Sequence, residues 1–363
     1  FKKPKKRLIK EMLYGIQASK DVKLSNISRT LKEEQSLIKT EDRLSRNLDD
    51  EDFTDPINRE ICRLGASKVT DDMVIAIDPG DIRKKYAKKM EFLGRVRDGS
   101  KNEIGEGYPL CKAVATDIES KKVIPLCCEA YSYLAEDFKS ENAQILKVID
   151  TIFEHLGDRG IHAHDRGGDR GVIYAKYLRR DKPQRFVIRL VDRDLMHQGR
   201  RRNCCEMAKV LPTPYETALI VYEEGKEKKR TVYYNAVPVK LPLYDHKLYL
   251  VVVKGFGMEP MMLLTSCSVR RYQKESMWRI VEYYLARWKC DESYRYIKQC
   301  YQLEGVRVRS YTSIRNIVVL VLAVSYFAAV YLGQSIKLKM LVERIFIVSK
   351  RFFGVPSFFN YAI

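Results

Sequence analysis

The sequence predicts an α/β protein in which a mixed β-sheet is covered by helices on both faces. Two observations lead to this prediction. Three short apolar segments with strand character lie within residues 73–128, and a short polar joint connects the second to the third. Helical and strand-like segments then alternate as far as residue 190. Antiparallel strands followed by alternating helices and strands are typical of a mixed sheet with helices on both sides.

The first half of this core is a set of three strands. Residues 73–77 form an apolar run that we expect to end at Asp78-Pro-Gly, because proline and glycine interrupt strands. Residues 110–116 and 123–128 are two further apolar runs, and the polar joint between them predicts a hairpin.

The second half alternates helices with strands. A helix is expected between Ser140, a good N-cap residue, and Gly157, a good stop. Residues 161–164 are predicted as a strand, residues 171–178 as a helix and residues 185–190 as a fifth strand. The resulting order, β-β-β-α-β-α-β, is that of a ribonuclease-H-like fold.

Two further helices are expected near the C-terminal end. Residues 276–303 predict one long amphipathic helix that ends near Gly305. Residues 317–332 are apolar on all sides over 16 residues. A membrane span needs about 20 residues, so a buried core helix is the favoured interpretation and a membrane helix the alternative.

The same patterns divide the chain into segments. The N-terminal segment has helical spacing, and residues 24–31 suit one helix of a helix-turn-helix, although a solvated helical cap fits equally well. We expect a helical DNA-binding domain (1–70), a first part of the core (71–190), a β-rich insertion (191–272), a second part of the core (273–333) and a basic, aromatic tail (334–363).

Composition narrows the class of partner. The 363 residues include 66 Lys and Arg against 47 Asp and Glu, which gives a net charge of +19. Hydrophobic residues make up 45%, which excludes a wholly disordered chain. The basic excess indicates a polyanionic partner, with nucleic acid the first candidate and a merely soluble basic protein the alternative. Nine cysteines, an odd number without a CxxC motif, predict a reducing compartment.

Two carboxylates stand where predicted strands end. Asp78 follows the first strand, and Asp165 follows the strand of residues 161–164. Aspartates placed alike on two strands of one sheet can share divalent metal ions, because hard cations prefer oxygen ligands. The alternative is that each aspartate only caps a turn.

A third carboxylate lies on the long predicted helix. At about 100° per residue, four side chains fall within an arc of about 60°, so one face offers a carboxylate beside an arginine, a lysine and a tyrosine hydroxyl. These four are Tyr284, Arg287, Asp291 and Lys298. Glu292 lies about 100° away from Asp291. The alternative is an ordinary solvated face with pairs such as Arg287 and Asp291.

These residues carry a resemblance to a known family. The chain resembles the DDE transposases of bacterial insertion sequences, in the group with a β-strand insertion domain and the motif Tyr-x2-Arg-x3-Glu-x6-Lys. The four residues of the helix face match that motif in spacing, with Asp291 at the position of the glutamate. Asp78 in Ile-Asp-Pro-Gly-Asp and Asp165 in Asp-Arg-Gly resemble the two aspartates of the family.

The resemblance implies an activity and its requirements. The implied activity is cleavage of transposon ends and their joining to target DNA, with a hairpin intermediate, by phosphoryl transfer with two Mg²⁺ ions that Mn²⁺ can replace. Asp78, Asp165 and Asp291 are the implied metal ligands. Tyr284, Arg287 and Lys298 are the implied DNA contacts, together with Arg200, Arg201 and Arg202 of the insertion. The implied setting is a homodimer on double-stranded DNA in the bacterial cytoplasm, at the nucleoid and not in a membrane.

Two departures from the family leave alternatives open. Aspartate is one methylene shorter than glutamate, so Glu292 is the alternative third carboxylate. The insertion has no tryptophan to hold a flipped base, and four tyrosines remain candidates for that stacking role: Tyr215, Tyr222, Tyr233 and Tyr234. Besides an active transposase, the sequence allows an inactive DNA-binding derivative or a nuclease that only hydrolyses.

Overall fold

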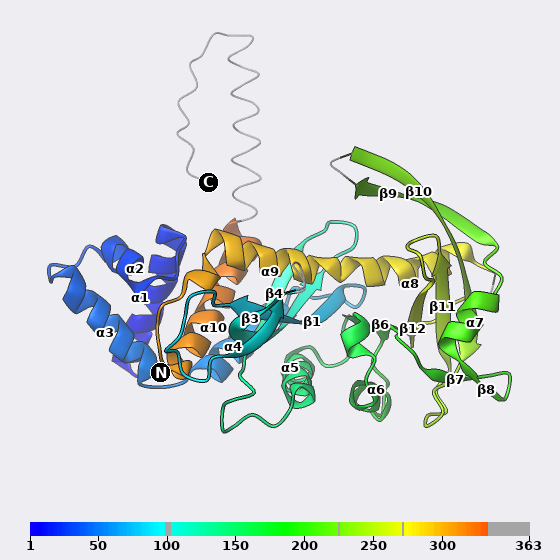
Figure 1. Cartoon of the computed structure of the whole chain (residues 1–363), viewed down its shortest axis with the longest axis horizontal. Helices are drawn as coiled ribbons and strands as arrows, with labels where there is room; N and C mark the ends of the chain where they lie inside the picture. The colour runs from blue at the N-terminus through cyan, green and yellow to red at the C-terminus, as the bar shows by residue number, and fades with distance from the viewer. Residues whose placement is uncertain (99–102, 224–225, 271, 333–363) are drawn as a thin grey trace, which may run out of the picture.

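A computed structural model describes residues 1–98, 103–223, 226–270 and 272–332. The predicted tail, residues 334–363, lies outside the described residues. A ten-stranded mixed sheet runs through the molecule in the order β2-β3-β1-β5-β6-β12-β11-β10-β9, and β4 pairs with β3 (Figure 1). Helices lie on both sides of the central part of this sheet, as the sequence predicts.

Five strands form the centre of the sheet. β1 (Val74–Arg83) is antiparallel to β3 (Glu103–Thr116) and parallel to β5 (Ile161–His164). β4 (Val123–Ala130) adds to β3, and β6 (Phe186–Arg189) runs parallel to β5. The order β4-β3-β1-β5-β6, with one antiparallel meander and two parallel pairs, is compatible with the predicted ribonuclease-H-like sheet. β2 (Gly94–Asp98) extends the other end of β3.

Helices α5 and α6 cover one face of the centre. α5 (Glu141–Leu156) begins where the Ser140 hydroxyl accepts a hydrogen bond from the backbone N–H of Ala143 at 3.1 Å, and it ends at Gly157. The φ of Gly157 is 65°, a left-handed conformation that suits glycine. The 3₁₀ turn η1 (Arg166–Gly168) leads into α6 (Gly171–Leu178). Both predicted helices are therefore confirmed.

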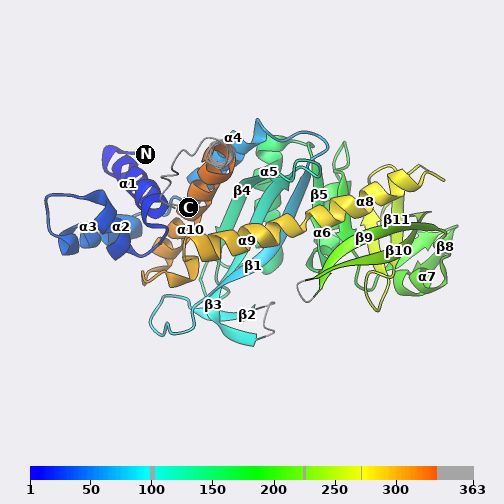
Figure 2. The same cartoon turned by 90° about the horizontal axis from the view of Figure 1, so that it is seen from above.

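The opposite face is crossed by α8 (Lys274–Ala286) and α9 (Trp288–Cys300) (Figure 2). The prediction of one uninterrupted helix over 276–303 is wrong at Arg287. There the helix tightens, because the Arg287 N–H bonds to the Tyr284 carbonyl and the Cys290 N–H bonds to the Arg287 carbonyl, each across three residues. The two halves remain close to one line, and η2 (Leu303–Gly305) follows α9.

The end of β1 also differs from the prediction. The strand does not stop at Asp78-Pro-Gly but continues to Arg83, paired with β3 throughout. β5 pairs with β1 only from Val74 to Ala76, so past that point β1 has a strand on one side only. Proline is tolerated in such a one-sided strand, which explains why Pro79 does not end it.

The β-rich insertion continues the central sheet. A ribbon of β7 (Asp194–His197) and β8 (Arg200–Asn203) leads into α7 (Cys204–Val210). The remaining strands are β9 (Tyr215–Glu223), β10 (Lys226–Val239), β11 (Leu248–Lys254) and β12 (Met261–Thr265). β12 pairs antiparallel with β6, with Leu264 opposite Ile188, so backbone hydrogen bonds join the insertion to the core. The sequence contains no local signal for this pairing.

The N-terminal helices share the hydrophobic core of the sheet. They are α1 (Lys3–Ser19), α2 (Leu24–Leu31), α3 (Leu37–Asp49) and α4 (Thr54–Ala66). Their apolar side chains belong to the same buried cluster as β1, β3 and the apolar helix α10 (Tyr311–Phe327). Asn316 of α10 adds polar links, since its side chain accepts from the Phe53 N–H and donates to the Leu48 and Glu51 carbonyls.

The apolar helix packs inside the protein. α10 and the π-helical turn η3 (Ala328–Leu332) together form one described helix whose length and composition would allow it to cross a membrane. In the structure, 72% of its most apolar window is buried, against β4, α4 and α1. This is the burial that the core-helix interpretation predicts.

An ion-pair cluster stabilises the N-terminal helices. Arg43 of α3 bonds to Glu33 at 2.8 Å and to Glu11 of α1 at 2.7 Å. The Gln35 side chain donates a hydrogen bond to Glu33, and this bond, followed by those from Arg43 and Thr40, lowers the pKa of Glu33 to about 2 although burial opposes the shift.

Glu33 therefore predicts a loss of stability in acid. A carboxyl group whose pKa is lowered by folding stabilises the fold at pH values above its ordinary pKa of 4.5. This stabilisation is lost as the pH falls toward the folded-state pKa of about 2. We expect Glu33→Gln to lower the free energy of unfolding at pH 6 and to reduce the further loss between pH 5 and pH 3. Urea unfolding at each pH measures this. Glu34→Gln, which removes an exposed neighbouring charge, should leave the pH profile unchanged; identical profiles for both variants would contradict the assignment.

Candidate active site

The candidate site lies where α8 and α9 cross β1. Asp78 points from β1 toward these helices and is buried, with 6% of its surface exposed. Its carboxylate oxygen Oδ2 accepts a hydrogen bond from Nη1 of Arg287 at 2.9 Å. Its backbone carbonyl accepts a bond from the Tyr294 hydroxyl at 2.8 Å. Asp78 lies two residues past the last residue of β1 that pairs with β5, so the sheet leaves room beside it for the helices.

Asp291 joins the same arginine. Nη1 of Arg287 lies 3.2 Å from Oδ2 of Asp291, so one guanidinium nitrogen contacts two carboxylates from segments far apart in sequence. Burial raises the pKa of Asp78 well above its usual range, Arg287 opposes this shift, and the charges of Asp165 and Asp291 add to it. The side chains of Asp78 and Arg287 are both more than nine-tenths buried, whereas that of Asp291 is half exposed.

Asp165 lies close to this pair without contacting it directly. It follows β5, and its Oδ1 accepts a hydrogen bond from the Gly167 N–H at 2.7 Å, which caps the turn η1. It lines a cavity of about 230 Å³ together with Tyr284 and Arg287. Its charge adds to the effect of burial in raising the pKa of Asp78. Asp165 therefore caps a turn, as the alternative interpretation predicts. It also lies beside Tyr284 and Arg287.

The arrangement suits a cation between Asp78 and Asp291. Both carboxylates already face one positive group, since the same Arg287 nitrogen contacts each of them. Carboxylate oxygens are also the ligands that Mg²⁺ prefers. In the part of the chain that the structure describes, no three His, Cys, Asp or Glu side chains lie close enough to hold a metal ion together. The structure therefore brings two carboxylates together at Arg287, with Asp165 nearby but outside this group.

Glu292 takes a different direction from Asp291. Its carboxylate pairs with Lys289 at 2.5 Å, and its side chain is 57% exposed. The structure thus brings Asp291, and not Glu292, to Asp78, which is the arrangement that the helix phase favours.

Tyr284 and Lys298 lie on either side of Arg287. Tyr284 is buried, its hydroxyl accepts a bond from Arg189 at 3.4 Å, and the Arg287 guanidinium lies 5.9 Å from its ring centre. Lys298 pairs with Asp81 at 3.4 Å and with Glu304 at 3.1 Å. Lys298 lines a second, larger cavity of about 1190 Å³ with Arg287 and Asp291. Arg287 therefore borders both cavities.

Other predicted residues lie elsewhere. Arg200, Arg201 and Arg202 are in β8, which pairs with β7 in a separate two-stranded sheet far from β1 (Figures 1 and 2). Arg201 pairs with Asp194 of the neighbouring strand at 2.8 Å. The structure does not bring these arginines to the carboxylates.

The four tyrosines proposed for stacking differ in exposure. Tyr234 is buried and its ring lies 5.3 Å from that of Trp278 in α8. Its ring also lies 6.0 Å from that of the partly buried Tyr215, whereas Tyr233 is 44% exposed. The side chain of Tyr222 lies outside the described part of the chain. Of the described three, Tyr233 presents the most accessible ring.

Sequence reasoning missed two residues at the site. Lys112 lies directly across from Asp78 in the β1–β3 pair and is fully buried. Its Nζ donates to the Ser293 hydroxyl at 2.7 Å and lies 5.3 Å from the centre of the Tyr294 ring, and burial lowers its pKa. A single lysine within an apolar strand was the available signal. Trp288, 55% exposed, borders both cavities next to Arg287.

The buried pair of Asp78 and Arg287 gives a first prediction for the site. Arg287→Met should lower the free energy of unfolding by about 3–5 kcal/mol, because it leaves a buried carboxylate without its partner. The double variant Asp78→Asn/Arg287→Met should lose about 2 kcal/mol less than the sum of the single variants. Urea unfolding measures both. In the exposed pair, Lys289→Met and Glu292→Gln should add to within about 0.5 kcal/mol. Additive effects at Asp78 and Arg287 would contradict the coupling.

Gly80 gives a second prediction. A methyl group on Gly80 would meet the buried ring of Tyr294, whose Cζ lies 2.7 Å from the position of that methyl. Gly80→Ala should therefore displace α9 and lower the free energy of unfolding by about 1–3 kcal/mol. Gly171→Ala is the control, because nothing lies within 4 Å of the corresponding methyl position. Equal stability of the two variants in urea unfolding would show that α9 does not depend on this contact.

Comparisons with known proteins show distant similarity only. No protein-family model matches the chain, and no curated protein matches it. Among solved structures, the chain is similar to a piggyBac transposase, determined by cryo-EM as a synaptic complex with hairpin DNA. The similarity covers 92% of this chain and 68% of that chain, with 11% sequence identity and a TM-score of 0.47.

Proposed function

We propose that the protein is a DNA transposase that cleaves transposon ends and joins them to target DNA by phosphoryl transfer. One observation carries the proposal: Asp78 of the central strand and Asp291 of the crossing helix converge on a single nitrogen of Arg287. Asp165 lies beside them at the end of the neighbouring parallel strand. The net charge of +19 is consistent with a polyanionic substrate.

The carboxylates are the proposed ligands of Mg²⁺. Asp78 and Asp291 would hold it, with Asp165 as the third oxygen donor. When bound, two such ions activate a water or a 3′-hydroxyl and stabilise the leaving oxygen of the phosphodiester.

The remaining site residues are proposed to hold the DNA. Arg287 borders both cavities, so it is placed to release a carboxylate and to bind a phosphate through its second nitrogen. Lys298 adds a positive charge on the side of the larger cavity, and Tyr284 positions the Arg287 guanidinium from the other side. We further propose that a homodimer on double-stranded DNA performs the reaction and that cleavage uses a hairpin route.

An inactive, transposase-derived DNA-binding protein is the second candidate. The observation that favours it is the state of the carboxylates, because Asp78 and Asp291 are both engaged by Arg287 and Asp165 caps a turn. Asp291 is also one methylene shorter than the glutamate of the family motif. In this alternative the charge of Arg287 permanently replaces that of a metal.

Cleavage assays separate these functions. The substrate is DNA that includes the sequences flanking this gene, incubated with the protein and Mg²⁺ or Mn²⁺. We expect nicked and joined products with the unmodified protein. Asp78→Asn, Asp165→Asn and Asp291→Asn should each lower the rate at least about 100-fold while DNA binding persists, because each removes one oxygen ligand.

Glu292→Gln is the matched control and should retain the unmodified rate. Full activity of Asp78→Asn would overturn the assignment of the site. Binding without cleavage by the unmodified protein with either metal would establish the inactive alternative. Nicks without joined products would establish a nuclease that only hydrolyses.

A further inference from the structure

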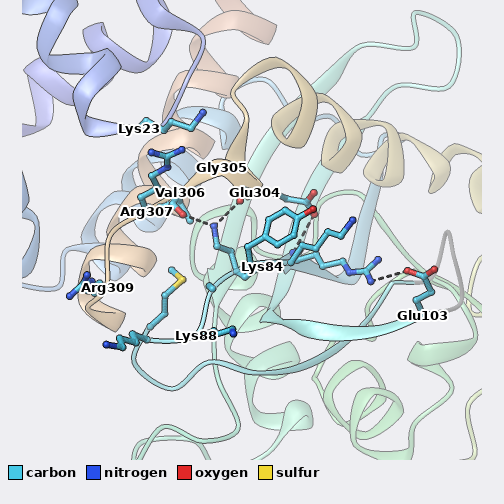
Figure 3. Close-up of a pocket in the computed structure, with 15 residues that line it drawn as sticks. Lys23, Lys84, Lys88, Glu103, Glu304, Gly305, Val306, Arg307 and Arg309 are labelled. Atoms are coloured by element: carbon cyan, nitrogen blue, oxygen red, sulfur yellow. Dashed lines mark hydrogen bonds and ion pairs between the residues drawn. The ribbon is translucent and has the colours of Figure 1, made fainter.

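A second basic feature lies apart from the carboxylates. A groove of about 940 Å³ runs between the start of α2, the chain that follows β1 and the segment from the end of η2 to Arg309 (Figure 3). We call it the α2–β1 groove. Eight lysines and arginines and two glutamates line it, which leaves a strong excess of positive charge. Nothing in the proposed reaction accounts for this concentration of cations.

Lys84 fixes the floor of the groove. It is buried, and its Nζ donates to the backbone carbonyls of Glu304, at 2.7 Å, and Val306 (Figure 3). These bonds attach the segment after α9 to the end of β1. Burial, together with the nearby charges of Arg307 and Lys23, lowers the pKa of Lys84 to about 8, although Glu304 opposes the shift. Three cations therefore lie near one another.

The wall of the groove is built by an alternating sequence. Val306 and Val308 are buried, while Arg307 and Arg309 between and after them are exposed and line the groove. Alternation in an extended segment sends every second side chain to the same side, so both arginines face the groove. Neither arginine forms an ion pair with another described residue, so both guanidinium groups are available to an anionic ligand.

The loop after β1 supplies the opposite side. Lys88 and Lys89 are exposed there, line the groove, and have no ion pair within the described residues. Figure 3 shows Lys88 below Lys84, across from Lys23 and Arg307. Tyr86 lies in the same loop and is 84% exposed, with the Lys85 ammonium 5.3 Å from its ring centre. An exposed aromatic ring among lysines favours a nucleic acid over an acidic protein, because every base has a face that stacks on it.

The α2–β1 groove leads to the candidate active site. Glu304 lines both this groove and the larger cavity that contains Asp291 and Lys298. Arg95 and Arg97 add further positive charge along that second cavity. The two cavities therefore adjoin at Glu304, and basic side chains line both of them.

We infer that the α2–β1 groove binds the phosphate backbone of DNA and guides the strand from the N-terminal helices to the candidate active site. Arg307 and Arg309 on one wall, with Lys88 opposite them, are the proposed phosphate contacts, and Tyr86 offers a surface for a base. The guiding role rests on the proposed function, whereas the binding itself does not.

The test compares two double variants that remove the same charge. Arg307→Gln/Arg309→Gln alters the groove, and Lys121→Gln/Lys122→Gln alters exposed lysines at the β3–β4 turn. Binding to a DNA duplex of mixed sequence is measured at several salt concentrations. Divalent metal is left out and all variants carry Asp78→Asn, so that the DNA is not cleaved during the measurement. Lys84 is left intact to preserve the fold, which circular dichroism checks.

Two lost phosphate contacts should reduce the slope of log K against log salt by about 2 and weaken binding about tenfold or more at low salt. The turn variant should change the slope by less than half as much. Equal effects of the two variants would overturn the inference, because net charge alone would then explain them. Tyr86→Ala should weaken binding to DNA but not to polyglutamate. If Tyr86→Ala and the arginine variant weaken both ligands alike, the groove is a general site for acidic chains and the inference fails.

Discussion

The ion pair between Arg287 and Asp78 connects the parts of the molecule on which the candidate site depends. Removing two charges from water is costly, so a buried pair persists only where geometry and hydrogen bonds compensate. Here the arginine stands at a tight turn between two helices, and the aspartate stands on a strand that has lost its neighbour on one side. The break between α8 and α9 and the end of the β1–β5 pairing therefore lie next to each other at this ion pair. Arg287 also borders two cavities, one on each side of it.

The contacts around this pair make the position of α9 specific. Tyr294 packs on Gly80 and bonds to the backbone of Asp78, and Lys112 bonds to Ser293 from the neighbouring strand. These contacts come from two consecutive residues of α9, Ser293 and Tyr294. Rotation of α9 would break all of them together, so the direction of the Asp291 side chain follows from the packing of buried neighbours rather than from its own contacts.

Local patterns in the sequence predicted the elements but not the way they meet. The helical spacing of apolar residues and the capping residues Ser140 and Gly157 predicted α5 correctly, because these signals act within a few residues of the sequence. Helix phase correctly placed Asp291, and not Glu292, on the face with Arg287, because it too depends only on residues close in sequence. The continuation of β1 through Pro79 depends on the absence of β5 beside it, which a local pattern cannot contain. The pairing of Leu264 with Ile188 and the burial of Lys112 likewise depend on segments distant in sequence.

The pairing of β12 with β6 has a mechanical consequence. A backbone ladder resists shear between its strands, because sliding one past the next breaks several hydrogen bonds at once. The strands from β9 to β5 form one uninterrupted ladder, and Asp165 stands at the end of β5. A force applied to the β9–β10 ribbon would therefore load the backbone hydrogen bonds of each strand pair on the way to β5. The insertion is joined to the core through this continuous pairing, and β12 with β6 is the pair that makes the connection.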